Sequence, residues 1–234
     1  SDFSAFSGYG FIRSYGVDCN QVPLILSAVQ SKGMKMFAGI YDIDQVEAET
    51  QELISAAQNN WDSIYAVTVG NEAVNDGVAT VAQVVAAVNQ ARTMLRAAGY
   101  TGPVVTVDTS AQVISNPALC QASDFAAANC HAFFNADLTP DQAGPWVLEQ
   151  AQRISEACGG KNTMITESGW PNQGESNGMA VPSEANQATA IASLRSSFSN
   201  NIVLFSAFND LWETNTAATF GTNQFWGIYG NAPA

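Results

Sequence analysis

Short apolar segments alternate with amphipathic helical patterns along the whole sequence, and this alternation limits the possible folds more than any other feature. The helical patterns have a period of about 3.6 residues, and Gly, Pro, Asn or Asp bounds most of the apolar segments. A repeat of roughly 30 residues is typical of βαβ units in a parallel sheet. We expect strands at residues 11–15, 34–40, 64–69, 103–107, 125–132, 163–165 and 202–208. The predicted fold class is therefore α/β, with a single domain over residues 1–234.

Capping residues predict where several helices begin. Asn20 is expected to cap the first helix, and Asp44 with Glu47 forms a capping pair for the second. Residues Thr139–Gln142 form a capping box with Pro at the first helical position, and Ser183 opens the last helix. The longest helical pattern predicts one apolar face that contains Val78, Val81, Val85, Val88 and Leu95.

The charge balance excludes several kinds of partner. Charged residues make up 12% of the chain, and the formal net charge is −13. Such a chain offers no cationic patch for nucleic acid or for an anionic membrane surface. No run of about 18 apolar residues exists that could form a membrane-spanning helix. This composition is typical of a secreted protein that handles neutral polar polymers.

Cysteine and histidine usage predicts disulfides rather than a metal site. The four cysteines are Cys19, Cys120, Cys130 and Cys158, and none of them forms a CxxC pair. An even count predicts one or two disulfides in an oxidising compartment, with three full pairings open and buried free thiols as the alternative. His131 is the only histidine, so no metal site and no cofactor is expected.

Two glutamates stand at the ends of predicted strands. Ala66–Asn71 is an apolar strand that leads into Glu72, and Thr163–Ile165 leads through Thr166 into Glu167. In a parallel sheet of βα units the carboxyl ends of the strands meet on one face, where active sites lie. Two carboxyl groups on such a face are the groups that cleave a glycosidic bond.

The sequences around both glutamates resemble glycoside hydrolase family 17. The resemblance rests on Val69–Glu72 and Thr166–Pro171, and it covers nearly the whole chain from Phe11 onward. Further motifs are similar to the fungal, cell-wall-associated branch of the family, namely Ile12–Gly16, Asn129–Phe134 and Phe205–Trp212. The resemblance implies a (β/α)8 TIM barrel whose first strand and most of whose first helix lie upstream of Ser1.

The resemblance also implies the chemistry. It assigns the acid/base to Glu72 and the nucleophile to Glu167, in a retaining mechanism with the two carboxyl groups about 5–5.5 Å apart. The implied substrate is β-1,3-glucan of the cell wall, cleaved in an endo fashion or transferred to another sugar. The implied location is extracellular or in the cell wall, and the expected oligomeric state is a monomer.

Polar residues near the strand ends are candidates for the site. Asn71 is expected either to hydrogen-bond the sugar 2-hydroxyl or the nucleophile, or to be a turn amide. Tyr15 is expected to orient the nucleophile, and His131 is more often a structural residue in such a setting. Asp108 and Asp210 either tune the glutamates or cap loops.

Aromatic residues after the strands are candidates for stacking on sugar rings. Packing in the core or at the rim is the alternative for each of them. They are Phe133, Phe134, Trp170, Phe208 and Trp212.

Two other functions stay open at this point. One is a non-catalytic protein of the cell wall that binds β-glucan through the same groove. The other is an α/β protein of different chemistry, although no phosphate loop, nucleophile elbow or metal cluster supports it.

Overall fold

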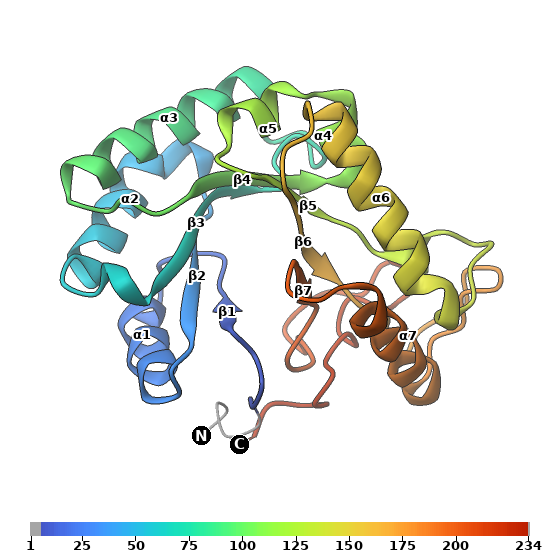
Figure 1. The fold of residues 1–234 in the computed structure, drawn as a ribbon. Helices are drawn as coiled ribbons and strands as arrows, with labels where there is room; N and C mark the ends of the chain where they lie inside the picture. Colours follow the sequence, from blue (N-terminus) through green and yellow to red (C-terminus); the bar gives the residue numbers. More distant parts are fainter. Residues whose placement is uncertain (1–5, 234) are drawn as a thin grey trace. The chain divides into compact units, whose positions relative to one another are not determined.

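The computed structural model describes residues 6–233. In this range seven strands alternate with helices, as predicted, and the strands follow one another in the sheet in chain order (Figure 1). The strands are β1 (Phe11–Arg13), β2 (Lys35–Ile40), β3 (Ile64–Asn71), β4 (Val104–Thr109), β5 (Ala126–Asn129), β6 (Thr163–Ser168) and β7 (Ile202–Leu204). The α-helices are α1 (Gln21–Ser31), α2 (Val46–Ala57), α3 (Val81–Ala97), α4 (Ser110–Ser115), α5 (Ala118–Ala122), α6 (Ala143–Ala157) and α7 (Glu184–Ser197).

Backbone contacts divide the chain into two compact units. The N-terminal unit comprises residues 6–127 and 155–162, and the C-terminal unit comprises residues 128–154 and 163–233 of the described range. The boundary falls within β5 and within α6, so each of these elements contributes to both units. A single domain over the whole chain stays a prediction.

In the N-terminal unit, β1 to β4 form a parallel sheet with α1, α2 and α3 on one face (Figure 1). Ile12 pairs with Met36 between β1 and β2, and Val67 pairs with Val104 between β3 and β4. Right-handed crossovers between consecutive parallel strands place each helix on the same face. The strands are apolar at almost every position because this sheet is buried on both faces.

Helix α3 begins later than its apolar pattern predicts. Val78 lies before the helix with 73% of its surface exposed, so its predicted place on the apolar face is wrong. Thr80 N donates to Gln83 Oε1 at 2.9 Å, and Gln83 N donates to Thr80 Oγ1 at 3.3 Å. This capping box starts the helix after Thr80. The buried face consists of Val84, Ala87, Val88, Ala91 and Leu95.

Two predicted helix caps are wrong. Asn20 occupies the capping position of α1 but has a φ of 58° and makes no capping hydrogen bond. Asp44 does not cap α2, because a 3-10 turn (Ile43–Gln45) precedes that helix. Asp42 opens this turn, since its Oδ1 accepts from Asp44 N at 2.9 Å.

Two other predicted caps are confirmed. Thr139 N donates to Gln142 Oε1 at 2.9 Å in the capping box that leads into α6. Ser183 Oγ accepts from Asn186 N at 3.1 Å and starts α7.

One disulfide is present among the described residues. It joins Cys120 of α5 to Cys158, directly after α6, within the N-terminal unit, and it confirms the expected oxidative pairing. Lys161 Nζ donates to Cys120 O at 2.7 Å, which places a cation at the C-terminal end of α5. Of the remaining cysteines, Cys19 is exposed and Cys130 is buried.

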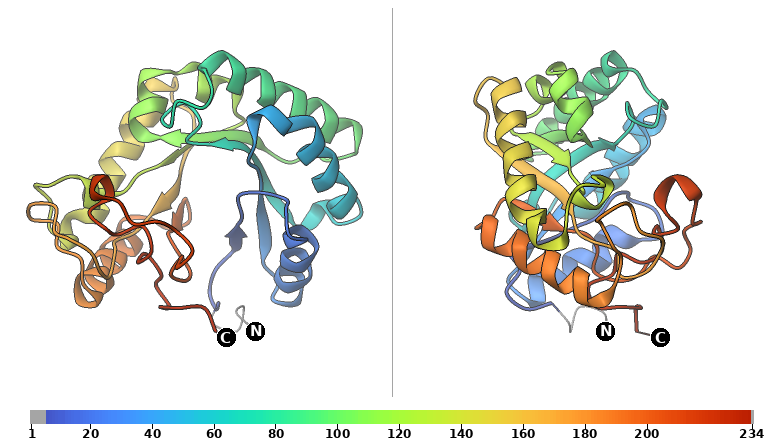
Figure 2. Two further views of the ribbon diagram at one scale, coloured as in Figure 1. Left: turned by 180° about the vertical axis from the view of Figure 1, so that it is seen from behind. Right: turned by 90° about the vertical axis from the view of Figure 1, so that its right-hand side faces the viewer.

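In the C-terminal unit, β6 and β7 pair in parallel, with Ile165 opposite Ile202. The segment after β7 runs as loops with one short helical turn (Figure 2). Backbone hydrogen bonds hold it in place: Ser206 N donates to Trp226 O at 3.1 Å, and Ile228 N donates to Ser206 O at 2.9 Å. None of the helices within residues 6–233 has the length and hydrophobicity to cross a bilayer.

Candidate active site

Glu72 follows β3 at a sharp bend of the backbone. Gly70 has a φ of 77° and Glu72 has a φ of 52°. This left-handed conformation costs about 1–2 kcal/mol for a residue that carries a Cβ. Two backbone hydrogen bonds hold it, from Glu72 N to Val107 O of β4 at 3.0 Å and from Asp76 N to Glu72 O at 2.9 Å. The C-terminal end of β3 therefore presents Glu72 in a fixed backbone conformation.

An arginine that the sequence analysis did not single out lies beside this bend. Arg13 of β1 donates from Nη2 to Asn71 Oδ1 at 2.8 Å, and its guanidinium lies 4.4 Å from the centroid of the Tyr15 ring. Gly39 of β2 allows this arrangement, because a Cβ there would overlap the Tyr15 carbonyl oxygen. Arg13 is the only charged residue in the three-residue strand β1, and a charge in such a setting needs polar partners. This feature of the sequence could have identified Arg13 as a candidate for the site. The role of Tyr15 as an orienting group for Glu167 stays a prediction.

Asp108 lies at the end of β4 and is 2% exposed. Its Oδ2 accepts from Val74 N at 2.9 Å, and its Oδ1 accepts from Thr109 N at 2.8 Å. Burial raises the pKa of the Asp108 carboxyl, and the backbone hydrogen bonds act in the opposite direction. Backbone donors therefore enclose this carboxylate on both oxygens, and a contact of Asp108 with substrate stays a prediction. The alternative prediction, a loop cap, agrees with the geometry.

In the C-terminal unit, Glu167 is held at the end of β6. Its carboxylate Oε2 lies 3.2 Å from His131 Nε2, and its carbonyl oxygen accepts from Cys130 N at 2.9 Å. Glu167 is 7% exposed. When the imidazole carries a proton on Nε2, it donates to the carboxylate, and such a bond stabilises the ionised form. The structure thus pairs the only histidine with the predicted nucleophile.

Aromatic rings surround the His131 ring. The centroid of His131 lies 4.8 Å from that of Trp226 and 5.4 Å from that of Phe205. Phe134 stacks in a tilted arrangement on Trp226 at 5.9 Å and is 45% exposed. These contacts fix the imidazole plane, and Phe134 offers an exposed ring at the edge of the cluster. Neither Phe205 nor Trp226 was predicted individually as a site residue, although Phe205 directly follows β7.

Two of the predicted stacking residues are buried. Phe133 and Trp170 each have 0% of their surface exposed, and their ring centroids lie 5.5 Å apart. Trp170 Nε1 also donates to Val181 O at 3.0 Å. A ring without an exposed face cannot stack on a sugar, so stacking is the wrong interpretation for these two residues. They pack against each other in the interior of the C-terminal unit.

The loop after β7 carries the remaining candidates. Trp212 is 79% exposed, and its Nε1 donates to Asp210 Oδ1 at 3.3 Å. Burial raises the pKa of the half-buried Asp210 carboxyl. Gln224 Nε2 donates to Glu213 O at 2.6 Å and thereby ties the loop to the C-terminal segment. The ring of Phe208 packs against that of Tyr229 at 6.2 Å.

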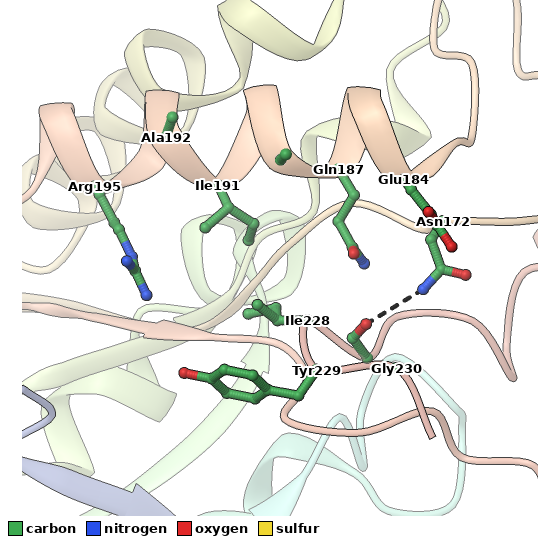
Figure 3. Close-up of a pocket in the computed structure, with 11 residues that line it drawn as sticks. Asn172, Glu184, Gln187, Ile191, Ala192, Arg195, Ile228, Tyr229 and Gly230 are labelled. Carbon is green, nitrogen blue, oxygen red and sulfur yellow. Dashed lines mark hydrogen bonds between the residues drawn. The ribbon is translucent and has the colours of Figure 1, made fainter. Parts of the chain in front are cut away.

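A separate cavity of about 550 Å³ lies between α7 and residues 227–230 (Figure 3). Asn172, Gln187 and Tyr229 are among the residues that line it, and Asn172 Nδ2 donates to Gly227 O at 3.3 Å. None of the predicted site residues lines this cavity. This cavity is therefore separate from the residues that the sequence predicts for the site. Within residues 6–233, no three His, Cys, Asp or Glu side chains are arranged to hold a metal ion.

Solved structures with the same fold identify the architecture. The glycoside hydrolase family 17 β-1,3-glucanosyltransferase from Rhizomucor miehei matches with a TM-score of 0.84 and 23% identity, over 99% of this chain and 87% of that chain. A plant β-glucan endohydrolase matches with a TM-score of 0.71 and 19% identity, over 95% of this chain and 88% of that chain. These likenesses confirm the predicted (β/α)8 barrel fold, of which the described residues contain seven strands.

A barrel of this fold with glutamates at two strand ends is the architecture of a glycoside hydrolase. The chain belongs to the BtgE/BtgC glycoside hydrolase family, whose domain profile matches residues 1–227. The predicted resemblance to family 17 is thereby confirmed.

Curated relatives match nearly the whole of this chain. The cell surface mannoprotein MP65 of Candida albicans is 48% identical over 234 residues, and the probable family 17 glucosidase SCW10 of Saccharomyces cerevisiae is 47% identical over 231 residues. The probable β-glucosidase btgE of Aspergillus fumigatus is 33% identical over 234 residues. These matches cover 99%, 97% and 98% of this chain, but only 61%, 59% and 41% of the respective relatives. The chain therefore spans only part of the length of the proteins it matches.

Proposed function

We propose that this protein cleaves β-1,3-glucan with retention of configuration and transfers the released glycosyl group to water or to another sugar. The observation that carries the proposal is the placement of Glu167 at the end of β6, with its carboxylate 3.2 Å from His131 Nε2. A nucleophilic carboxylate must stay ionised, and a ring N–H donor favours that state. Membership of a glycoside hydrolase family supports the reaction class.

In this mechanism Glu167 attacks the anomeric carbon and forms a glycosyl ester with the enzyme. Glu72 gives its proton to the departing glycosidic oxygen and later takes a proton from the acceptor hydroxyl. Hydrolysis results if the acceptor is water, and transglycosylation results if it is a sugar. The two carboxyl groups are expected about 5–5.5 Å apart for a retaining mechanism.

The substrate class rests on the relatives. A solved neighbour is described as a β-1,3-glucanosyltransferase, and its active-site mutant is in complex with laminaritriose. We propose that Phe134 and Trp212 stack on glucosyl rings, because both rings are exposed in the C-terminal unit. Asn71 contacts the sugar 2-hydroxyl or the nucleophile in this proposal. The net charge of −13 suits an uncharged polysaccharide and disfavours nucleic acid.

We further propose an extracellular or cell-wall location and a monomeric state. One relative is named a cell surface mannoprotein. The disulfide between Cys120 and Cys158 suits an oxidising compartment.

A direct test replaces each glutamate in turn. Glu167→Gln is expected to lower turnover of laminarin by at least about 10³-fold, since removal of a covalent nucleophile abolishes the main route. Glu72→Ala is expected to be rescued by azide on a dinitrophenyl laminaribioside, with formation of the β-glycosyl azide, because this leaving group departs without a proton and azide needs no general base. Reducing-sugar release and mass spectrometry of the products measure both effects. Wild-type turnover in Glu167→Gln contradicts the proposal.

A second candidate function is a glucan-binding wall protein without catalysis. The relative with 48% identity is named as a cell surface mannoprotein and not as an enzyme, which favours this alternative. Glucan pull-down measured beside product release separates the two functions. Binding of laminarin without any new oligosaccharide would establish the alternative, whereas products longer than the donor would establish transfer.

A further inference from the structure

The turn after Glu72 is fastened to β4 by a buried side chain. Within the turn, Val78 N and Ala79 N both donate to Ala73 O at 3.0 Å, so residues 73–79 fold back on themselves. Asp108 attaches this turn to the sheet through its hydrogen bond from Val74 N at 2.9 Å. A further backbone hydrogen bond comes from Asn75. The turn is thus held by its own backbone and by one carboxylate.

This attachment acts on a residue in a disfavoured conformation. Glu72 has a φ of 52°, a region that side chains with a Cβ rarely occupy. Such a conformation persists only where the surroundings determine it. On one side, Glu72 N is bonded to Val107 O of β4. On the other side, the turn that begins at Ala73 is bonded to Asp108, the residue directly after Val107.

We infer that Asp108 is a positioning residue for Glu72. Its carboxylate fixes the turn and thereby directs the Glu72 side chain toward the leaving-group oxygen. Without it the Val74 N–H loses its acceptor, the turn shifts, and Glu72 relaxes from the left-handed region. A displacement of a catalytic group by about 1 Å is enough to lower the reaction rate strongly. This inference rests on the proposed role of Glu72 as the acid/base.

Two substrates with different leaving groups distinguish a positioning role of Asp108 from a role in stability alone. Departure of a sugar alkoxide needs a proton from Glu72, whereas a dinitrophenolate departs without one. We expect Asp108→Asn and Asp108→Ser to lower kcat/KM for laminarin about 10- to 100-fold, a part of the effect of a general acid. We expect kcat/KM for a dinitrophenyl laminaribioside to stay within about threefold. The ratio of the two values does not depend on the fraction of folded enzyme, so partial unfolding of a variant leaves the test valid.

Asp124 provides a matched control. Its Oδ2 accepts from Val104 N at 2.7 Å at the opposite end of β4. Asp124→Asn therefore weakens the same kind of bond, from a carboxylate to a backbone N–H, and it also removes the ion pairs of Asp124 with Arg92 and Arg96. We expect it to alter stability without changing the ratio. Three outcomes would overturn the inference. The Asp108 variants could lose kcat/KM equally on both substrates, or they could lose it on neither. Asp124→Asn could also change the ratio to the same extent as the Asp108 variants.

Glu72→Ala distinguishes this inference from the proposed function. If Glu72 is the acid/base, this variant changes the ratio in the same direction as the Asp108 variants and to a greater extent. A changed ratio in Glu72→Ala with an unchanged ratio in Asp108→Asn refutes the positioning role alone. An unchanged ratio in Glu72→Ala refutes the acid/base assignment, and the positioning role falls with it.

Discussion

At the scale of single residues, the two glutamates are supported in different ways. Glu72 depends on its backbone, which is bent at a φ of 52° and bonded to Val107 O. Glu167 depends on a side chain, since His131 Nε2 lies 3.2 Å from its carboxylate. His131 in turn is held by Trp226 and Phe205. Loss of either support should therefore have a recognisable and different effect on catalysis.

His131→Ala is expected to lower kcat/KM about 10- to 100-fold, the range of one hydrogen bond to a charged group. Because the nucleophile acts on every substrate, laminarin and the dinitrophenyl glycoside should be affected alike. Thr166→Val is the control, since it removes a buried hydrogen bond of 2.9 Å to Asn129 Oδ1 between the same two strands. Steady-state kinetics on both substrates measure the effects. Unchanged kinetics in His131→Ala would show that the imidazole does not support Glu167.

At the scale of secondary-structure elements, the disulfide links the short helix α5 to the end of the long helix α6. Helix α5 has five residues, and the bond to Cys158 joins it to the end of α6 across 38 residues of sequence. The carbonyl groups at the end of α5 are also bonded by Lys161, with 2.7 Å from Nζ to Cys120 O. This corner lies in the N-terminal unit, and no predicted site residue belongs to it.

Replacement of both Cys120 and Cys158 by Ala is expected to lower the free energy of unfolding by about 2–4 kcal/mol, through the added freedom of the unfolded chain. Urea titration of the variant and the oxidised wild type measures this difference. Turnover per folded molecule at low temperature should be nearly unchanged. Cys19→Ala is the control, because Cys19 is exposed and outside the disulfide. A double variant as stable as the wild type would show that the bond does not stabilise the fold.

At the scale of the whole molecule, buried carboxyl groups and the net charge act in the same direction. Burial is the largest cause that raises the pKa of Asp108, Asp210 and Glu49 in the folded protein. A carboxyl whose pKa is higher in the folded state stabilises the fold fully below its unfolded pKa. This contribution is lost as the pH rises through the folded pKa. The surplus of acidic residues adds repulsion as carboxyl groups ionise.

The melting temperature is therefore expected to fall as the pH rises from about 4 to about 7. A few degrees is the expected size, because 1 kcal/mol corresponds to about 2–4 °C at this chain length. Asp108→Asn should show a smaller fall, since the amide does not titrate. Calorimetry in matched buffers at constant ionic strength measures the effect. A melting temperature that rises over this range would contradict the direction of these pKa shifts.

The sequence by itself determined the α/β class, the order of the seven described strands and the two glutamates that follow or end them. Apolar periodicity and capping residues are local properties of the chain, and most of them need no distant partner. Prediction from the sequence was wrong where the position of a residue depended on contacts with distant residues. Val78 leaves the apolar face because it lies in the turn before α3, and Trp170 is buried in contact with Phe133, a residue distant in sequence.

Only the tertiary structure decided what supports the catalytic groups. The pairing of His131 with Glu167 joins residues that are 36 positions apart in sequence, and that of Asp108 with Val74 spans 34 residues. Arg13 contacts Asn71 across 58 residues. No local pattern specifies such contacts, because they arise from strand register and from the direction of each side chain at a strand end. The chain alone therefore predicted which residues are proposed to react, and the packing of the fold decided which residues hold them.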